Sequence, residues 1–198
     1  MTKGIQRGRK MEPYYCGKIL NGKYSAALKK RVSGYLENLQ MLDELNLPVI
    51  VYLAAWKTDE ETIWYEFTCR RFQQMMGCAP DEIAGAFRNS VLDRRVYVYA
   101  NIQDDVAKES LNKSELSTSR RKLRRKTGEE GQVEAVYKIL LEKGRAFWLK
   151  DQAVIETHPK DGISLSLGCM MVVSKEMEAT EEKERLVAKL QKTLTDFQ

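Results

Sequence analysis

Apolar residues first recur with a helical period after residue 22 of the sequence. Steps of four and three predict an amphipathic helix over residues 23–46, and the same spacing is that of a coiled-coil seam. The apolar stripe of this helix consists of Leu28, Val32, Tyr35, Leu39 and Leu42. Because the stripe covers barely two heptads, packing against the helix's own domain and pairing with a second chain both remain open. Residues 1–22 show no clear period and contain four glycines, so we expect a flexible lead-in there.

The period then changes to that of strands. Residues 49–53 form a short apolar, β-branched run after Pro48, and the stretch IWYEFT follows a polar turn, which together predict a β-hairpin. The stretch CRRFQQMMG, with its final Gly77, predicts a short helix. Pro80 and the two acidic residues after it mark the start of a second helix, which we expect to end at Gly85.

Residues 86–127 are expected to be mainly helical. The stretch FRNSVLDRRVYVYANI predicts a helix followed by an extended piece. Residues 103–128 start with two aspartates and end with basic residues, an order that complements a helix dipole. We therefore expect one or two helices in residues 103–128.

Three strands complete the expected fold. The stretches VEAVYKILL, AFWLKDQAVIET and ISLSLGCMMVV are separated by short turns that contain Gly144 and Gly162, which predicts an antiparallel meander. With the first hairpin, this gives five strands around a helical middle. The expected fold class is α+β, with one five-stranded antiparallel sheet, helices on one face, and a flanking helix at each end.

The last segment of the sequence is densely charged and again has a helical period. Residues 175–198 begin with several glutamates, which suit a helix N-terminus, and Ser174 before them suits an N-cap. A second short seam consists of Val187, Leu190, Leu194 and Phe197. The expected organisation is a lead-in over residues 1–22, a helix over 23–46, a domain over 47–174 and a terminal helix over 175–198.

Composition limits the class of protein. With 43% hydrophobic residues in a chain of 198, a sizeable core can form, and no apolar run reaches the roughly 18 residues of a membrane span. We therefore expect a cytoplasmic protein without a membrane partner. The four cysteines lie far apart with a single histidine, His158, so we expect reduced thiols and no metal site. The sequence holds no nucleophile–histidine arrangement and no phosphate-binding glycine loop, so we expect no catalytic activity.

The net charge of +5 is concentrated in one place. The run SRRKLRRKTG places six basic residues within positions 120–126. Runs of this kind contact phosphates in nucleic-acid-binding proteins, but no interleaved aromatic residues or base-reading motif accompany this one. We favour a solvated helix face, and we do not expect nucleic acid as a partner.

The order of these elements and several short phrases resemble the PAS domain family. The stretch FQQMMGCAPDEIAG resembles the family's phrase of Phe, a hydrophobic residue, Gly, an aromatic residue and Glu-Glu-hydrophobic-x-Gly, with Cys78 in place of the aromatic residue. Trp148 and Leu149 stand where the family often has a Trp-hydrophobic pair, and Asp161 with Gly162 occupies the turn before the last strand. The resemblance covers about residues 47–180.

The sequence departs from the family at the joint between the last strand and the terminal helix. The family commonly has Asp-Ile-Thr there, whereas this sequence has Val172, Val173 and Ser174. These three residues are the expected signal-coupling positions. Since the aspartate is absent, we expect any coupling to use packing and the helix cap.

The resemblance implies a sensor that detects a small molecule, a redox state or a partner and relays the change through its flanking helices to an effector domain. Sensor histidine kinases of two-component systems and diguanylate cyclases are examples of such signalling proteins. The ligand pocket would lie between the inner sheet face and the central helices. Its candidate lining residues are Tyr52, Trp64, Phe67, Phe72, Met76, Phe87, Tyr137 and Trp148. Plain core packing is the alternative for each of them.

Neither cofactor nor output can be named from the sequence. The stretch TCRRFQQ lacks the phrase of a flavin site of the light-sensing type, and His158 falls in a turn, away from the helices that would supply a haem ligand. The expected partners are a second copy, paired through both flanking helices, and an effector domain downstream or in trans. The alternative function is a ligand-free PAS module for dimerisation or docking.

Overall fold

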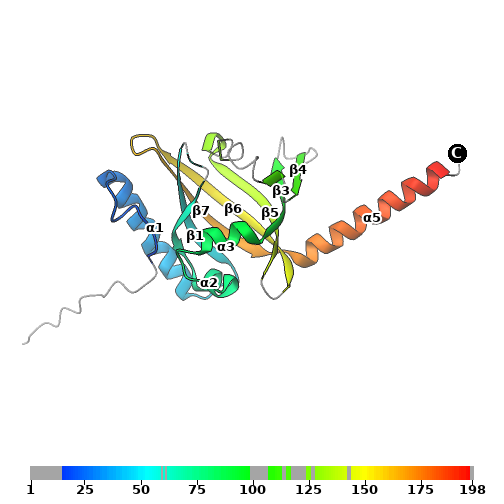
Figure 1. Cartoon of the computed structure of the whole chain (residues 1–198), viewed down its shortest axis with the longest axis horizontal. Coiled ribbons are helices and arrows are strands. Elements are labelled where there is room, and N and C mark those ends of the chain that lie inside the picture. Colours follow the sequence, from blue (N-terminus) through cyan, green and yellow to red (C-terminus); the bar gives the residue numbers. More distant parts are fainter. Residues whose placement is uncertain are drawn as a thin grey trace, which may run out of the picture.

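A computed structural model describes residues 15–58, 60, 62–98, 107–112, 115–116, 124–125, 128–141 and 144–196. These residues form one seven-stranded antiparallel sheet with helices on both faces (Figure 1). The elements in chain order are α1 (Ala26–Glu44), β1 (Ile50–Lys57), β2 (Trp64–Thr68), α2 (Arg70–Met76), α3 (Ile83–Ser90), β3 (Val91–Val98), β4 (Ala107–Asn112), β5 (Gln132–Leu140), β6 (Ala146–His158), β7 (Ile163–Val172) and α5 (Ser174–Asp196).

The order of strands across the sheet is β2-β1-β7-β6-β5-β3-β4. The first five are the strands that the sequence predicts, so the α+β class and the single antiparallel sheet are confirmed. The predicted number of five strands is wrong, because a hairpin of β3 and β4 extends the sheet beyond β5. This hairpin lies where the sequence predicts mainly helices.

The physical reason for this difference lies in tertiary pairing. β4 has the sequence AKESLN, whose polar residues suit a helix, yet it pairs along its whole length with β3. Charged residues are also common on exposed edge strands, where they discourage association with other sheets. Pairing with a neighbour therefore overrides the helical pattern over residues 107–112. α3 also differs from expectation, since it continues through Gly85 to Ser90.

Side chains in each strand alternate between two faces of the sheet. We call the side that carries α2 and α3 the inner face, and the side that carries α1 and the base of α5 the outer face. Leu53 points outward and Tyr52 inward, and their partners across the sheet follow the same alternation. This assignment decides which residues can share a cavity.

Helix α1 packs on the outer face of its own sheet. The side chain of Ser25 caps the helix by accepting a hydrogen bond from the Leu28 N–H, and Ser25 also donates two hydrogen bonds of 2.7 Å to Asp161 in the β6–β7 turn. The buried residues of the helix are Leu28, Val32, Leu36 and Leu39. Of the two arrangements that the sequence left open, the structure therefore shows the one in which this helix packs against its own domain.

This packing corrects the residues assigned to a dimer seam. Leu28, Val32 and Leu39 are at most 3% exposed, and Tyr35 and Leu42 are partly buried against the same core. In this conformation the three buried side chains are not available to a second chain. Pairing with a second copy remains a proposal, and it must use other residues of α1 or the terminal helix.

The described part of the predicted lead-in is also packed. Ile19 is fully buried, and Tyr15 forms an isolated β-bridge with Phe67 of β2. Residues 15–22 therefore belong to the folded domain and cover the free edge of β2. The remainder of the predicted lead-in lies outside the described residues.

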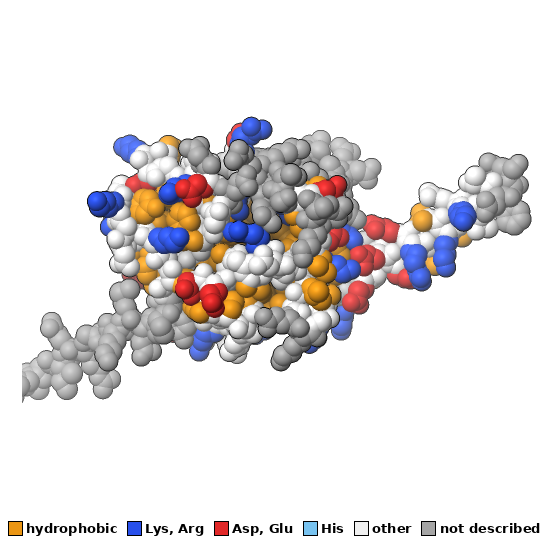
Figure 2. Space-filling model, viewed as in Figure 1, with side chains coloured by type: hydrophobic (Ala, Val, Ile, Leu, Met, Phe, Trp, Pro, Cys, Tyr) orange, Lys and Arg blue, Asp and Glu red, His pale blue; other side chains and the backbone are white. Residues whose placement is uncertain are grey.

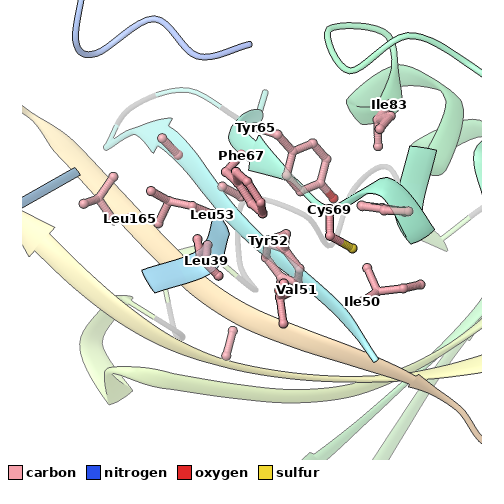
Figure 3. Packing of buried hydrophobic residues seen from close by; sticks show 14 of the residues in the cluster. Leu39, Ile50, Val51, Tyr52, Leu53, Tyr65, Phe67, Cys69, Ile83 and Leu165 are labelled. Atoms are coloured by element: carbon pink, nitrogen blue, oxygen red, sulfur yellow. The ribbon is translucent and has the colours of Figure 1, made fainter. Parts of the chain in front are cut away.

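The main hydrophobic core is continuous through the sheet. Figure 3 shows it around β1, where Leu39, Leu53 and Leu165 gather on one side and Ile83 of α3 lies beyond Tyr65. A second, smaller cluster of Val136, Trp148 and Met177 lies on the outer face where α5 begins.

Helix α5 leaves the domain after its first turns (Figure 1). The space-filling view shows acidic side chains near its base and basic ones farther along (Figure 2). Leu186, Val187 and Leu190 are between 44% and 65% exposed, so the described residues leave this part of the helix largely without apolar cover. Among the described helices, none has the length and apolar character needed to cross a membrane.

Candidate functional site

A cavity of about 160 Å³ lies on the inner face of the sheet. Its walls come from β1, β2, β3, β5, β6 and β7, and α3 lies across it. Aromatic and aliphatic side chains make up most of the lining. The polar lining residues are Tyr52, Tyr65, Tyr137, Arg88, Arg94, Arg124, Asp151 and Ser166.

The structure brings only three of the eight predicted pocket residues to this cavity, namely Tyr52, Phe87 and Tyr137. Trp64 and Phe67 pair with Ala55 and Leu53, which belong to the outer face. Trp148 also faces outward, where it packs with Met177. Phe72 and Met76 lie on α2 and contribute to the core beside the cavity. For these five residues, core packing is the role that the structure shows.

Tyr52 and Asp151 form a hydrogen bond across an intervening strand. The Tyr52 hydroxyl donates to Asp151 Oδ1 at 2.7 Å, although β1 and β6 are separated by β7. The tyrosine ring passes over Gly168 of β7, where an added Cβ would lie 2.4 Å from Tyr52 Oη. The glycine therefore makes room for this buried contact.

A chain of aromatic rings borders the cavity. Tyr52, Tyr65, Phe72, Phe87 and Tyr137 follow one another in edge-to-face contacts, with centroids 5.5 to 5.6 Å apart. Such contacts fix the orientation of each ring. Tyr65, which sequence reasoning missed, connects β1 to the helices, and its pairing with Ala54 places it inward.

Three arginines line the cavity, and sequence reasoning missed all of them. Arg88 comes from α3 and is half-buried, whereas Arg94 of β3 is only 4% exposed. Arg124 belongs to the basic run that we interpreted as a solvated helix face, but it is half-buried at the cavity. Arg125 is exposed, and the other four basic residues of that run lie outside the described part.

Burial changes the protonation of the polar lining. It raises the pKa of Asp151 from its ordinary value of 3.8 to about 7, although the hydrogen bond from Tyr52 lowers it in part. Burial likewise raises the pKa of Tyr52, Tyr65 and Tyr137, so these phenols remain neutral. The alternation of Leu149, Asp151 and Ala153 along β6 is the sequence signal that places this carboxyl on an apolar face.

We expect Asp151 to make stability fall as pH rises. Between about pH 4 and pH 7 the folded protein retains a proton that the unfolded chain releases, so the free energy of unfolding decreases across this window by up to about 4 kcal/mol. Above about pH 8 this contribution is constant. Urea unfolding at several pH values measures the slope.

The variant Asp151→Asn isolates this contribution, because its amide oxygen still accepts the Tyr52 hydrogen bond but does not titrate. Its unfolding free energy should vary less between pH 5 and pH 8 than that of the native protein. Asp81→Asn, at an exposed position, should retain the native slope. Equal slopes in the native protein and Asp151→Asn would contradict the assignment.

The joint between β7 and α5 is attached to β6 at Trp148. Val173 N–H donates to the Trp148 carbonyl at 2.9 Å, and the Trp148 N–H donates to Ser174 Oγ at 3.0 Å. Ser174 was predicted to be the N-cap of the terminal helix, but it is the first residue of α5. Its hydroxyl accepts a hydrogen bond from strand β6. Val172 is 61% exposed and lines a second cavity of about 730 Å³. Of the three predicted coupling residues, Val173 and Ser174 contact the sheet through these bonds.

A second attachment joins α5 to β3. Arg95 is 7% exposed, its guanidinium carbon lies 4.4 Å from the centre of the Trp148 ring, and its Nη2 lies 2.7 Å from Glu181 Oε1. Met177 packs against the same tryptophan. Sequence reasoning did not find Arg95 or Glu181 as coupling residues, because β3 was not expected to lie beside α5.

The cysteines and the histidine do not converge at the cavity. No disulfide joins Cys16, Cys69, Cys78 and Cys169, and none of them is among the lining residues of the cavity. His158 is the last residue of β6 and not part of the turn as predicted, with its Nε2 3.0 Å from Glu156 Oε1. Among the described residues there is no group of three or more potential metal ligands.

The chain contains two strands, two short helices and a three-stranded meander, and its strands form one antiparallel sheet over an inner cavity. This is the arrangement that the sequence resemblance implies. The chain has a PAS-like fold. The β3–β4 hairpin is an addition to the five PAS-like strands. No protein-family model and no curated protein matches the sequence.

Solved structures that are similar to the chain have low sequence identity to it. A sensory box histidine kinase/response regulator from Burkholderia thailandensis is 12% identical, with a TM-score of 0.45 over 77% of this chain and 97% of that one. An RNA-binding light-oxygen-voltage receptor is 14% identical, with a TM-score of 0.48 over 81% of this chain and 39% of that one. A light-oxygen-voltage domain described with a flavin analogue is 16% identical, with a TM-score of 0.42 over 74% and 96%.

Proposed function

We propose that this PAS-like domain is a sensor that binds a small molecule in the inner cavity and relays its presence to α5. The observation that carries the proposal is the position of β3. Arg94 of this strand lines the cavity, and the next residue, Arg95, holds α5 on the outer face. A change at the cavity wall therefore has a direct route to the helix.

Helix α5 is suited to pass the change to an effector domain, downstream or in trans. Its first turns are held by Trp148 and Arg95, whereas Leu186, Val187 and Leu190 are exposed on the part that leaves the domain. An exposed apolar stripe on a projecting helix is suited to pair with the same stripe of a second copy. Sedimentation that shows only monomer at high concentration would contradict this dimer.

We expect the variant Arg95→Gln to loosen the base of α5. The change removes the ion pair with Glu181 and the stacking on Trp148, so amides after Met177 should exchange with deuterium about ten-fold faster. Hydrogen–deuterium exchange with mass spectrometry measures this effect. Arg185→Gln is the control, because Arg185 pairs with Glu182 on the same helix, and its exchange should stay near the native rate. Native-like exchange in Arg95→Gln would show that β3 does not hold the helix.

The alternative is a ligand-free module that serves dimerisation or docking. The modest volume of the cavity and its dense aromatic border are the observations that favour it. Native mass spectrometry and absorption spectra of protein purified without denaturant separate the two functions. A bound small molecule supports the sensor. A measured mass equal to that of the polypeptide alone, in a protein that binds no added small molecule, supports the module.

A further inference from the structure

The inner cavity has the size and the walls for one small, flat ring. An engineered apolar cavity of about 150 Å³ in a protein binds benzene, and the cavity here has a similar volume of about 160 Å³. Tyr52, Tyr65, Phe87 and Tyr137 line it, and each of these rings is held by an edge-to-face contact with a neighbour. Because aromatic rings pack well against one another in such geometry, these walls favour a planar ring as ligand.

Four polar groups of the lining make no hydrogen bond with any residue that the structure describes. They are Asp151 Oδ2 and the hydroxyls of Tyr65, Tyr137 and Ser166. The hydrogen bond from Tyr52 goes to the other oxygen of Asp151, Oδ1. Asp151, Tyr65 and Ser166 are only 5% to 7% exposed. Buried polar groups nearly always have a partner, so these four point to a bound molecule that supplies one.

The unpartnered groups come from separate strands but lie close together. Tyr65 is on β2, Tyr137 on β5 and Asp151 on β6. Burial raises the pKa of both tyrosines most, and the charge of Asp151 raises it further. Because the interaction between charges weakens with distance, this influence places both hydroxyls near the carboxyl. One small molecule can therefore contact several of these groups.

The chemistry of these groups defines the edge of the ligand. An ionised carboxylate oxygen only accepts hydrogen bonds, so the ligand must present an N–H or O–H group to Asp151 Oδ2. Hydroxyl groups also donate, so carbonyl oxygens or ring nitrogens of the ligand suit Tyr65 and Tyr137. A ring that carries donors and acceptors at several positions meets both conditions, whereas a hydrocarbon ring meets neither.

The charges around the cavity favour a neutral ligand. Arg94 and Arg124 already have an interaction partner in the structure. Arg88 is half-buried on α3, and a long side chain of this kind can keep its charged end in contact with solvent. Burial raises the pKa of Asp151 to about 7, which shows that the cavity disfavours a buried charge. A ligand with a net charge would incur the same desolvation cost.

Resting on the proposed sensor function, we propose that the inner cavity binds a neutral six-membered nitrogen heteroaromatic ring of the pyrimidine-base type. The ring packs among the aromatic side chains, and one of its N–H groups donates to Asp151 Oδ2. Its carbonyl oxygens accept hydrogen bonds from the hydroxyls of Tyr65 and Tyr137. Uracil, cytosine and thymine are simple probes of this class.

Isothermal titration of the native chain with uracil tests the proposal. We expect a Kd of about 100 µM or lower, which is within the range for efficient ligands of this size. Three other compounds each change one feature. Benzene keeps the flat ring without polar groups, 5,6-dihydrouracil keeps the polar groups on a ring that is not flat, and orotate adds a carboxylate to uracil. Each should bind at least about five-fold more weakly than uracil.

Each comparison has an outcome that would overturn a part of the proposal. Equal or tighter binding of benzene would refute the role of the polar groups. Equal or tighter binding of 5,6-dihydrouracil would refute the requirement for a flat ring, and that of orotate would refute the preference for a neutral ligand.

A variant that loses only a hydroxyl locates the site. Tyr137→Phe should weaken uracil binding about five-fold and leave benzene binding unchanged, because it keeps the ring and removes one hydrogen bond. Tyr24→Phe is the matched control, because Tyr24 is half-buried outside the cavity, and it should bind both compounds as the native protein does. We expect Tyr137→Phe to fold, since its hydroxyl has no described partner to lose.

A second variant tests the carboxylate. Asp151→Asn still accepts the hydrogen bond from Tyr52, but it replaces the acceptor Oδ2 with an amide donor. We expect it to weaken uracil binding at least about ten-fold, because a charge-assisted hydrogen bond is lost. Native affinity for uracil in both Asp151→Asn and Tyr137→Phe would show that uracil does not bind in the inner cavity.

The outcomes also separate this proposal from the proposed function. If uracil, cytosine and thymine all fail to bind but native mass spectrometry finds another small molecule in the protein, the ligand class is wrong and the sensor stands. If the native protein holds no small molecule and no titrated compound binds, both are wrong. Slower deuterium exchange in α5 on addition of uracil would support both.

Discussion

Replacing Gly168 with alanine is expected to lower the free energy of unfolding by about 3 kcal/mol, which corresponds to a fall of roughly 10 °C in Tm. The new Cβ would lie 2.4 Å from the Tyr52 hydroxyl oxygen and 2.8 Å from the Ala153 Cβ. Both neighbours are held in the sheet, so the ring of Tyr52 must move. Its hydrogen bond to the buried Asp151 is then lost, which adds an unsatisfied carboxyl to the steric penalty. Denaturant unfolding measures the change.

Gly34→Ala is the matched control for this variant. Gly34 lies on the exposed side of α1, and an added Cβ there would meet no atom within 4 Å. Alanine should stabilise the helix by about 0.5 to 1 kcal/mol. If Gly168→Ala is as stable as the native protein, the contact between Tyr52 and Asp151 across β7 does not exist in solution.

Glu66→Ala is the second change with a large expected effect. Glu66 is fully buried in β2 and accepts hydrogen bonds from Tyr15 Oη at 2.7 Å, from the N–H groups of Lys18 at 2.9 Å and Ile19 at 3.1 Å, and from Trp64 Nε1. Alanine leaves all of these donors without their acceptor. We expect a loss of about 3 to 5 kcal/mol in the free energy of unfolding.

Two further variants define the cause of this loss. Glu66→Gln has nearly the same shape, but its amide group places a donor among donors, so we expect a smaller loss of about 2 kcal/mol. Glu60→Ala removes an exposed carboxylate that pairs with Lys57, and it should change stability by less than about 0.5 kcal/mol. Limited proteolysis should cut Glu66→Ala near residues 15–22, and resistance of that segment would argue against its attachment through Glu66.

The sequence was sufficient to predict the elements that have a clear period. The strands at 50–57, 132–140 and 163–172 follow apolar runs, and the helix ended by Gly77 has the left-handed glycine that its pattern indicates. β3 was predicted only in part, as an extended piece after a helix, and β4 was missed, because residues 91–112 mix charged and β-branched positions. The pairing of β3 with β5 and of β4 with β3 makes them strands.

The site was predictable only in part, for a reason of geometry. Alternation shows that two neighbouring strand residues lie on opposite faces, but it does not show which face is inner. Trp148 and Phe67 are as apolar as Tyr137, yet they point to the other side. The buried positions of Glu66 and Arg94 depend on partners from distant segments, so the local sequence pattern does not predict them.

The adjacent positions of Arg94 and Arg95 have a mechanical consequence. Because consecutive side chains of a strand project from opposite faces, a roll of β3 about its long axis moves the two guanidinium groups in opposite directions. β3 lies next to the edge strand β4, whereas β6 has several strands on each side. The sheet therefore resists such a rotation less at β3 than at β6. A ligand that draws Arg94 toward the cavity would thereby shift Arg95 relative to Glu181. Rotation of β3 would then couple the interior of the domain to helix α5.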